Sequence, residues 1–274
     1  MRTVILSLVT SFLLAVAAQA TTADTTRMQK LLRTIGIDTY LASFAEDVGG
    51  ADNPMARSIG GIAEAWTTSS LENFAPEEMF ADVVYEMNGR LSDGHMSELE
   101  HFFAAPLGRR IAAMEVAAQR PGVSLTVKTE GADLLGSLID SQDNRLEQLG
   151  TLIDALSAEE TGLAMALSLN RAVLSGMSAS GRLPYKLSSD QIDALVSSQR
   201  RLIRGTIRDQ LLISMAYTYQ TLSDGELDRY IAFLKTDAGQ QFYIEMLIAT
   251  QSVISERAHR FGERLMEHQA TENL

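Results

Sequence analysis

The chain of 274 residues contains no cysteine and only four histidines. The absence of cysteine excludes disulfide bonds, thiolate nucleophiles and cysteine-based zinc sites in one step. The chain also lacks a Gly-x-Ser-x-Gly sequence, the turn that positions the nucleophile of α/β-hydrolases. These absences remove the side-chain patterns on which several large enzyme classes depend.

Basic side chains are also in short supply. The chain has 23 lysines and arginines against 35 aspartates and glutamates, which gives a net charge of −12. Phosphate binding requires a basic footprint, so nucleic acid is excluded as a partner. The acidic charge is spread along the chain and serves solubility.

Long hydrophobic runs are missing apart from one near the N-terminus. The run Val4–Ala17 follows Arg2 and precedes Ala18–Ala20, a small-x-small cleavage sequence, so Met1–Ala20 is predicted to be a secretory signal peptide. We expect cleavage between Ala20 and Thr21 and a periplasmic or secreted protein, with a retained anchor as the alternative. A membrane span needs roughly 20 apolar residues, so the chain is not expected to be an integral membrane protein.

Strand signals are nearly absent, because the best of them, Val123–Val127, is too short and isolated to form a sheet. Apolar residues make up 46% of the chain and only five prolines interrupt it, so it can bury a sizeable core. Elsewhere apolar residues recur at helical spacing. The predicted fold class is all-α.

The most informative feature is a segment that occurs twice. Leu91–Arg110 and Leu222–Gln241 share Leu-Ser-Asp-Gly and further positions at a constant separation of 131 residues. We therefore interpret the chain as a tandem duplication of a small helical-bundle domain. The residues of the repeated motif are Ser92, Phe102, Gly108, Ser223, Glu226, Phe233 and Gly239.

Each repeated segment carries the start signals of a helix. Ser92 and Ser223 are predicted N-caps, each followed by an acidic residue in the positive first turn. Ser223 and Glu226 form a full capping box. After about three turns a bend precedes a second helix, and the glycine in the bend, Gly108 or Gly239, either adopts a positive φ or permits a close helix contact.

These residues resemble the DUF2059 domain family, small all-helical domains of exported bacterial proteins. The resemblance is best over Leu222–Gln241 and looser over Leu91–Arg110, where Pro106 and Leu107 replace polar residues. A further match, Leu31-Leu32-x-x-Ile35-Gly36-Ile37, extends it over most of residues 28–120. The resemblance implies an all-helical fold and export, and it supplies no catalytic residues.

The predicted organisation is a signal peptide at residues 1–20, a first repeat at 21–140 and a second at 141–274. Each repeat is long enough to bury a core of its own. Ser157, Ser188 and Ser223 are predicted to cap three successive helices of the second repeat, so we expect a fragment from about Ser141 to fold independently. The alternative is that helices of the two repeats interleave in one core.

Two Glu-x-x-His pairs are the candidate metal ligands of the sequence. Glu98 with His101 and Glu256 with His259 would each share a helix face, as in the di-iron sites of helical bundles. The pairs do not occupy equivalent places in the repeat, so we interpret them as solvated surface residues. We expect no metal site, no cofactor and no catalytic residues.

Aromatic side chains are few, and five of them are candidates for a ligand-stacking wall. Residues in helices are more often part of the core or its rim than of such a wall, and we interpret these aromatics in that way. The five are Trp66, Tyr217, Tyr219, Tyr230 and Tyr243.

The sequence therefore favours an exported, non-enzymatic helical protein that binds an unknown protein partner in the cell envelope or itself, as a homo-oligomer. The alternative is a carrier that holds an apolar ligand between helices, for which Phe102, Phe103, Phe233 and Phe242 are the candidate lining. A metal-dependent enzyme ranks third. An apolar pocket of several hundred Å³ would favour the carrier over the scaffold.

Overall fold

The computed structural model describes residues 24–50, 63–179 and 186–272; the predicted signal peptide and its cleavage site lie outside these ranges. Within them every regular element is a helix, which confirms the all-α class. Val123–Val127, the best strand signal, lies almost entirely in a helix. A helical segment at 24–34 comes first, followed by α2 (Ile37–Gly49), α4 (Ala63–Asn73), α5 (Pro76–Met87), α6 (Asp93–Ala104), α7 (Pro106–Ala118), α8 (Ser124–Asp140), α9 (Arg145–Ala155), α10 (Ala158–Ala179), α11 (Ser189–Ser198), α12 (Arg200–Thr218), α13 (Asp224–Leu234) and α14 (Asp237–Glu272).

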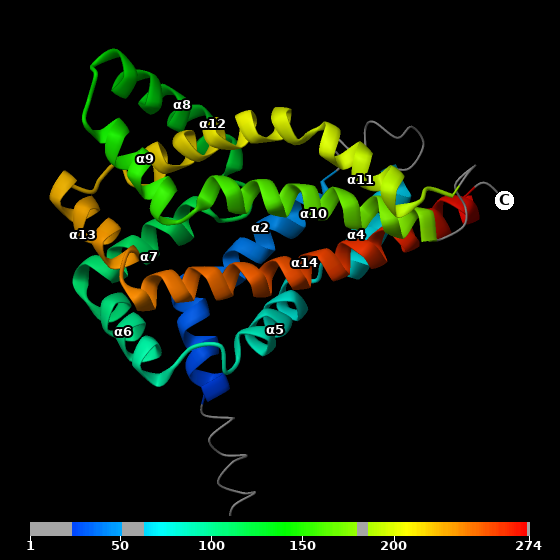
Figure 1. Ribbon diagram of the computed structural model, residues 1–274, viewed down its shortest axis with the longest axis horizontal. Helices are drawn as coiled ribbons and strands as arrows, with labels where there is room; N and C mark the ends of the chain where they lie inside the picture. Colours follow the sequence, from blue (N-terminus) through cyan, green and yellow to red (C-terminus); the bar gives the residue numbers. More distant parts are fainter. Residues whose placement is uncertain (1–23, 51–62, 180–185, 273–274) are drawn as a thin grey trace, which may run out of the picture.

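The long helix α14 is the central element. Figure 1 shows it crossing the molecule with α10 alongside, α8 and α12 on one side, and α5 and α6 on the other. Gly176 on α10 and Gly262 on α14 meet where the two helices cross, and a Cβ on either glycine would lie within 2.5 Å of a backbone oxygen of the other helix. The two helices therefore pack backbone against backbone at this point. None of the described helices has the length and apolar character needed to cross a bilayer.

The two repeated segments adopt the predicted helix–bend–helix structure. Ser92 begins α6 by accepting a hydrogen bond from the His95 amide at 3.1 Å. Ser223 begins α13 with a complete capping box, in which Glu226 Oε2 accepts from the Ser223 amide at 2.8 Å. Both N-cap predictions are confirmed.

The glycines of the two bends permit close backbone contact. Neither Gly108 nor Gly239 has a positive φ. A Cβ on Gly108 would lie 2.0 Å from the Phe102 carbonyl oxygen, and a Cβ on Gly239 would lie 2.5 Å from that of Phe233. Of the two predicted roles, a positive φ or a close helix contact, the close contact is therefore correct. At each bend the new helix packs against the end of the preceding one.

The helices of the two predicted repeats share one core. Helix α14, from the second, packs against α4, α5 and α6 of the first. Phe261 contacts Trp66 edge to face, with ring centroids 4.7 Å apart, and buried apolar residues of both halves form a single cluster. The expectation of two separate cores is wrong, because the apolar face of α14 is wide enough to cover neighbours from both halves.

Two sharp breaks between helices position the cavity described below. Gly36 separates the segment 24–34 from α2 with φ +83°, and Ser157 separates α9 from α10 with φ +48°. The Ser157 carbonyl accepts the first hydrogen bond of α10 from the Thr161 amide at 3.0 Å, but its side chain accepts no hydrogen bond from an amide in the described part of the chain, so the predicted side-chain cap is absent. Ser188, by contrast, caps α11 with a complete capping box, as predicted.

Candidate ligand-binding site

A cavity of about 520 Å³ lies between α2, α7, α10 and α14. Its wall is largely apolar, and each of the two helix breaks supplies one branched apolar residue to it, Ile35 before Gly36 and Leu156 before Ser157. The remaining lining residues are Ile37, Tyr40, Phe44, Glu115, Gln119, Thr161, Gly162, Met165, Ala166, Leu169, Tyr243, Met246, Leu247 and Thr250.

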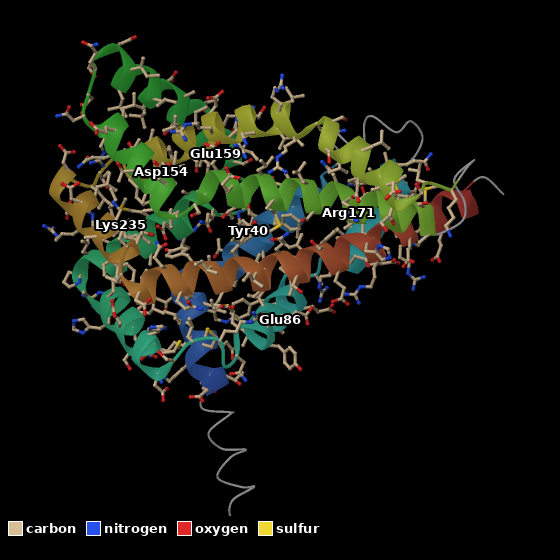
Figure 2. All side chains as sticks on the ribbon, in the orientation of Figure 1. Tyr40, Glu86, Asp154, Glu159, Arg171 and Lys235 are labelled. Carbon is tan, nitrogen blue, oxygen red and sulfur yellow. The ribbon has the colours of Figure 1, made fainter. Side chains whose placement is uncertain are left out.

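Figure 2 labels one of the aromatic side chains of this wall. Tyr40 projects from α2 into the region between α10 and α14. Phe44 follows it one turn later on the same helix face and also lines the cavity. The α2 wall is therefore aromatic, whereas the α10 wall is built from aliphatic and small residues.

The floor of the cavity is polar and centres on Glu115 of α7. Its Oε1 atom accepts a hydrogen bond from the Tyr219 hydroxyl at 2.6 Å and another from the Tyr230 hydroxyl at 2.8 Å. The hydroxyl oxygens of Tyr230 and Tyr243 lie 3.0 Å apart. One carboxylate and three tyrosines thus form a continuous hydrogen-bonded network.

The surroundings of Glu115 make its negative charge unfavourable. Burial raises the pKa of this carboxyl, and the hydrogen bonds from Tyr219 and Tyr230 oppose that rise only in part. Burial and the neighbouring carboxylate raise the pKa values of Tyr219 and Tyr230 well above the ordinary range. The phenols therefore stay protonated at neutral pH and act as hydrogen-bond donors.

Glu115 is nevertheless not sealed from solvent. Its side chain is only half-buried, because it borders the cavity. A second hollow of about 250 Å³ shares Glu115, Gln119, Leu156 and Tyr243 with the first and extends toward α12. The carboxylate therefore borders two neighbouring hollows and can be reached by a ligand from either.

The residues of the predicted repeat motif do not line this cavity. Ser92, Ser223 and Glu226 cap helices, and Gly108 and Gly239 form the bends. The four phenylalanines proposed as carrier lining, Phe102, Phe103, Phe233 and Phe242, pack in or against the core instead. None of these four residues lines the hollow between α2, α7, α10 and α14.

The two Glu-x-x-His pairs lie on the surfaces of different helices. Glu98 and His101 are exposed on α6, and Glu256 is exposed on α14 beside a partly exposed His259. The nearest carboxylate to His259 Nε2 is Glu263, at 3.8 Å. In the described ranges no group of three His, Asp or Glu side chains has an arrangement that could hold a metal ion.

Three of the five aromatics that we interpreted as residues of the core or its rim belong to this site. Tyr219 and Tyr230 are buried in the core and Tyr243 packs against it, as expected, but all three also join the Glu115 network, which the sequence did not predict. Glu115 was not predicted from the sequence. A local signal for it existed, since Glu115 lies four residues after the buried Ile111 and therefore on the apolar face of α7. A charged residue in register with an apolar face marks a buried polar group.

No protein-family model, curated protein or solved structure matches this chain. The resemblance to the DUF2059 family therefore stays a prediction.

Proposed function

We propose that the protein is a carrier that binds an apolar small molecule in the cavity between α2, α7, α10 and α14. The observation that carries this proposal is a mostly apolar hollow of about 520 Å³, partly open to solvent, between four helices that also form the core. Small-molecule sites are commonly concave, mostly apolar hollows of about 300 to 1,000 Å³. The scaffold role expected from the sequence stays a prediction with less specific support.

The chemistry of the cavity floor supports binding rather than catalysis. A tyrosine acts as a general base only after it loses its proton, and the raised pKa values of Tyr219 and Tyr230 oppose that loss. The three hydroxyls are engaged with Glu115 or with each other. We therefore propose a non-enzymatic role.

Export fits this proposal. If Met1–Ala20 directs the chain to the periplasm or outside the cell, the protein works in an aqueous compartment where apolar molecules dissolve poorly. A carrier shields such a molecule from water and so keeps it soluble.

Binding of the hydrocarbon fluorophore diphenylhexatriene tests the proposal. Its fluorescence should rise on titration with the protein and saturate at one probe per chain. Ala166→Phe fills the cavity from the α10 wall and should weaken binding at least about ten-fold, because the added ring occupies the space of the probe. Ala117→Phe makes the same change on the exposed face of α7 and should leave binding unchanged. Absence of probe binding, or equal binding by the Ala166→Phe protein, would contradict the carrier proposal.

A further inference from the structure

We propose that the ligand is a lipophilic amine, whose ammonium group binds Glu115 while its apolar part fills the space between α10 and α14. This inference rests on the proposed carrier function and adds to it the chemical class of the ligand. Three observations support it: the positions of the hydroxyl protons, the charges of the lining side chains, and the aromatic rings of the wall.

The first observation is a count of protons at the cavity floor. With Glu115 ionised, Tyr219 and Tyr230 each donate their only hydroxyl proton to its Oε1 atom. Tyr243 must then donate its own proton to Tyr230, since that hydroxyl has no proton left. The network has thus used all its hydroxyl protons.

What remains open at the floor is therefore a set of acceptors. Glu115 Oε2 makes no hydrogen bond to the described part of the chain, and it is not among the fully buried atoms that lack a partner. Tyr243 has an unused lone pair and also lines the cavity. A ligand that satisfies these atoms has to be a hydrogen-bond donor, and an ammonium group offers up to three N–H donors.

The second observation concerns charge. Among the residues that line the two hollows, all of them in the described part of the chain, there is no lysine, arginine or histidine. A carboxylate held among protein atoms without a cation is unfavourable. A cationic ligand supplies the missing charge, whereas a carboxylate ligand would add a second negative charge beside Glu115.

The third observation is the aromatic wall. Tyr40 and Phe44 of α2 line the same hollow as Glu115, and Tyr243 of α14 belongs to its hydrogen-bonded network. The faces of aromatic rings attract cations, and this attraction is stronger where water is displaced. The aliphatic side chains Met165, Leu169 and Leu247 then offer an apolar surface to the rest of the ligand.

Three ligands with the same ten-carbon chain test this inference: decylamine, which is protonated at neutral pH, decanol and decanoate. Each is titrated against protein loaded with diphenylhexatriene. Decylamine should displace the probe at a concentration at least about ten-fold lower than decanol, which corresponds to one charge-assisted hydrogen bond. Decanoate should be the weakest competitor, because its charge repels that of Glu115.

Glu115→Gln provides the matched variant. It keeps the size of the side chain and an oxygen that accepts from both tyrosines, so we expect it to fold and to bind decanol as the original protein does. The preference for decylamine over decanol should fall to within about two-fold. Glu147→Gln, which makes the same change on an exposed face of α9, should keep the full preference and so controls for net charge.

The outcomes separate the two proposals. If decylamine and decanol compete equally, or decanoate competes best, the amine inference is wrong and the carrier proposal stands. If none of the three displaces the probe, or the probe itself does not bind, the carrier proposal fails. A Glu115→Gln protein that retains the amine preference also overturns the assignment of Glu115.

Discussion

Phe102 stacks face to face on Phe233, with ring centroids 3.6 Å apart and ring planes within 2° of parallel. The two residues hold equivalent places in the repeated segments, 131 residues apart. A second pair of contacts follows the same separation, since Arg90 is equivalent to Thr221 and Met114 is equivalent to Glu245. Arg90 binds Glu245 at 3.0 Å, and Thr221 Oγ1 lies 3.7 Å from Met114 Sδ. Reciprocal contacts of this kind characterise a twofold interface, so the repeated segments meet as two subunits of a symmetric dimer would.

The first prediction concerns this stacked pair. Phe102→Leu and Phe233→Leu should each destabilise the protein, and the double variant should lose less than the sum of the two. The difference, the coupling energy, should be about 0.5 to 1.5 kcal/mol, the range for aromatic pairs. Urea unfolding of the four proteins measures it. Additive losses would mean that the rings contribute only by burial and not by their mutual contact.

The second prediction concerns the bend before α14. Gly239→Ala should lower the free energy of unfolding by about 1 to 3 kcal/mol, because its Cβ would lie 2.5 Å from the Phe233 carbonyl oxygen. Gly205→Ala, inside α12 where a Cβ meets no atom within 4 Å, should instead stabilise the protein by about 0.4 to 1 kcal/mol. Thermal unfolding compares the two. A harmless Gly239→Ala would show that the shared glycine is incidental.

Local patterns predicted the fold where the structure depends on neighbours in sequence. Ser92 and Ser223 cap helices because an N-cap needs only its own side chain and amides within the next turn. Ser157 precedes the same kind of sequence, yet it adopts a left-handed backbone between α9 and α10. Its conformation depends on how α10 packs, which the capping pattern does not contain.

The candidate site was harder to predict because its parts lie far apart in the chain. Glu115 receives its hydrogen bonds from Tyr219 and Tyr230, which are 104 and 115 residues away. The spacing of apolar residues shows which face of α7 is buried, but it does not show which helix covers that face. The same limit explains why the sequence offers Phe102 and Phe233 only as candidate lining of an alternative ligand cavity and does not show that they contact each other.

The third prediction concerns Arg257, a buried arginine that links α14 to the first half of the chain. It donates to Asp82 Oδ2 and to the Asn73 carbonyl oxygen, and its side chain is only 7% exposed, whereas that of Asp82 is 50% exposed. Asp82→Ala leaves a buried guanidinium without its main partner and should cost about 3 kcal/mol. Arg257→Met leaves an aspartate that water can solvate and should cost about 1 to 2 kcal/mol. Urea unfolding measures both losses of stability. A larger loss for Arg257→Met than for Asp82→Ala would mean that the hydrogen bond to the Asn73 carbonyl contributes more than the ion pair with Asp82.

The fourth prediction concerns pH. Because burial raises the pKa of folded Glu115 above its ordinary value of 4.5, the folded protein binds this proton more tightly than the unfolded chain does. The resulting stability is complete below the ordinary pKa and is lost as the pH rises through the folded pKa. Glu115→Gln lacks this loss, so its melting temperature relative to the original protein should increase from pH 4 to pH 7. A flat difference for Glu115→Gln would contradict the assigned burial effect.

The last prediction follows from the shared core. A fragment from Ser141 to Leu274 lacks α4, α5 and α6, so the face of α14 that carries Arg257 and Phe261 would lose the partners that cover it. Exposed apolar faces of this kind promote association. We therefore expect the fragment to be helical but to melt without cooperativity or to self-associate, and we expect a cooperative transition to return when residues 21–140 are added. Circular dichroism and sedimentation measure both properties. A monomeric fragment that melts cooperatively would show that the second half carries a sufficient core of its own, as its length alone had suggested.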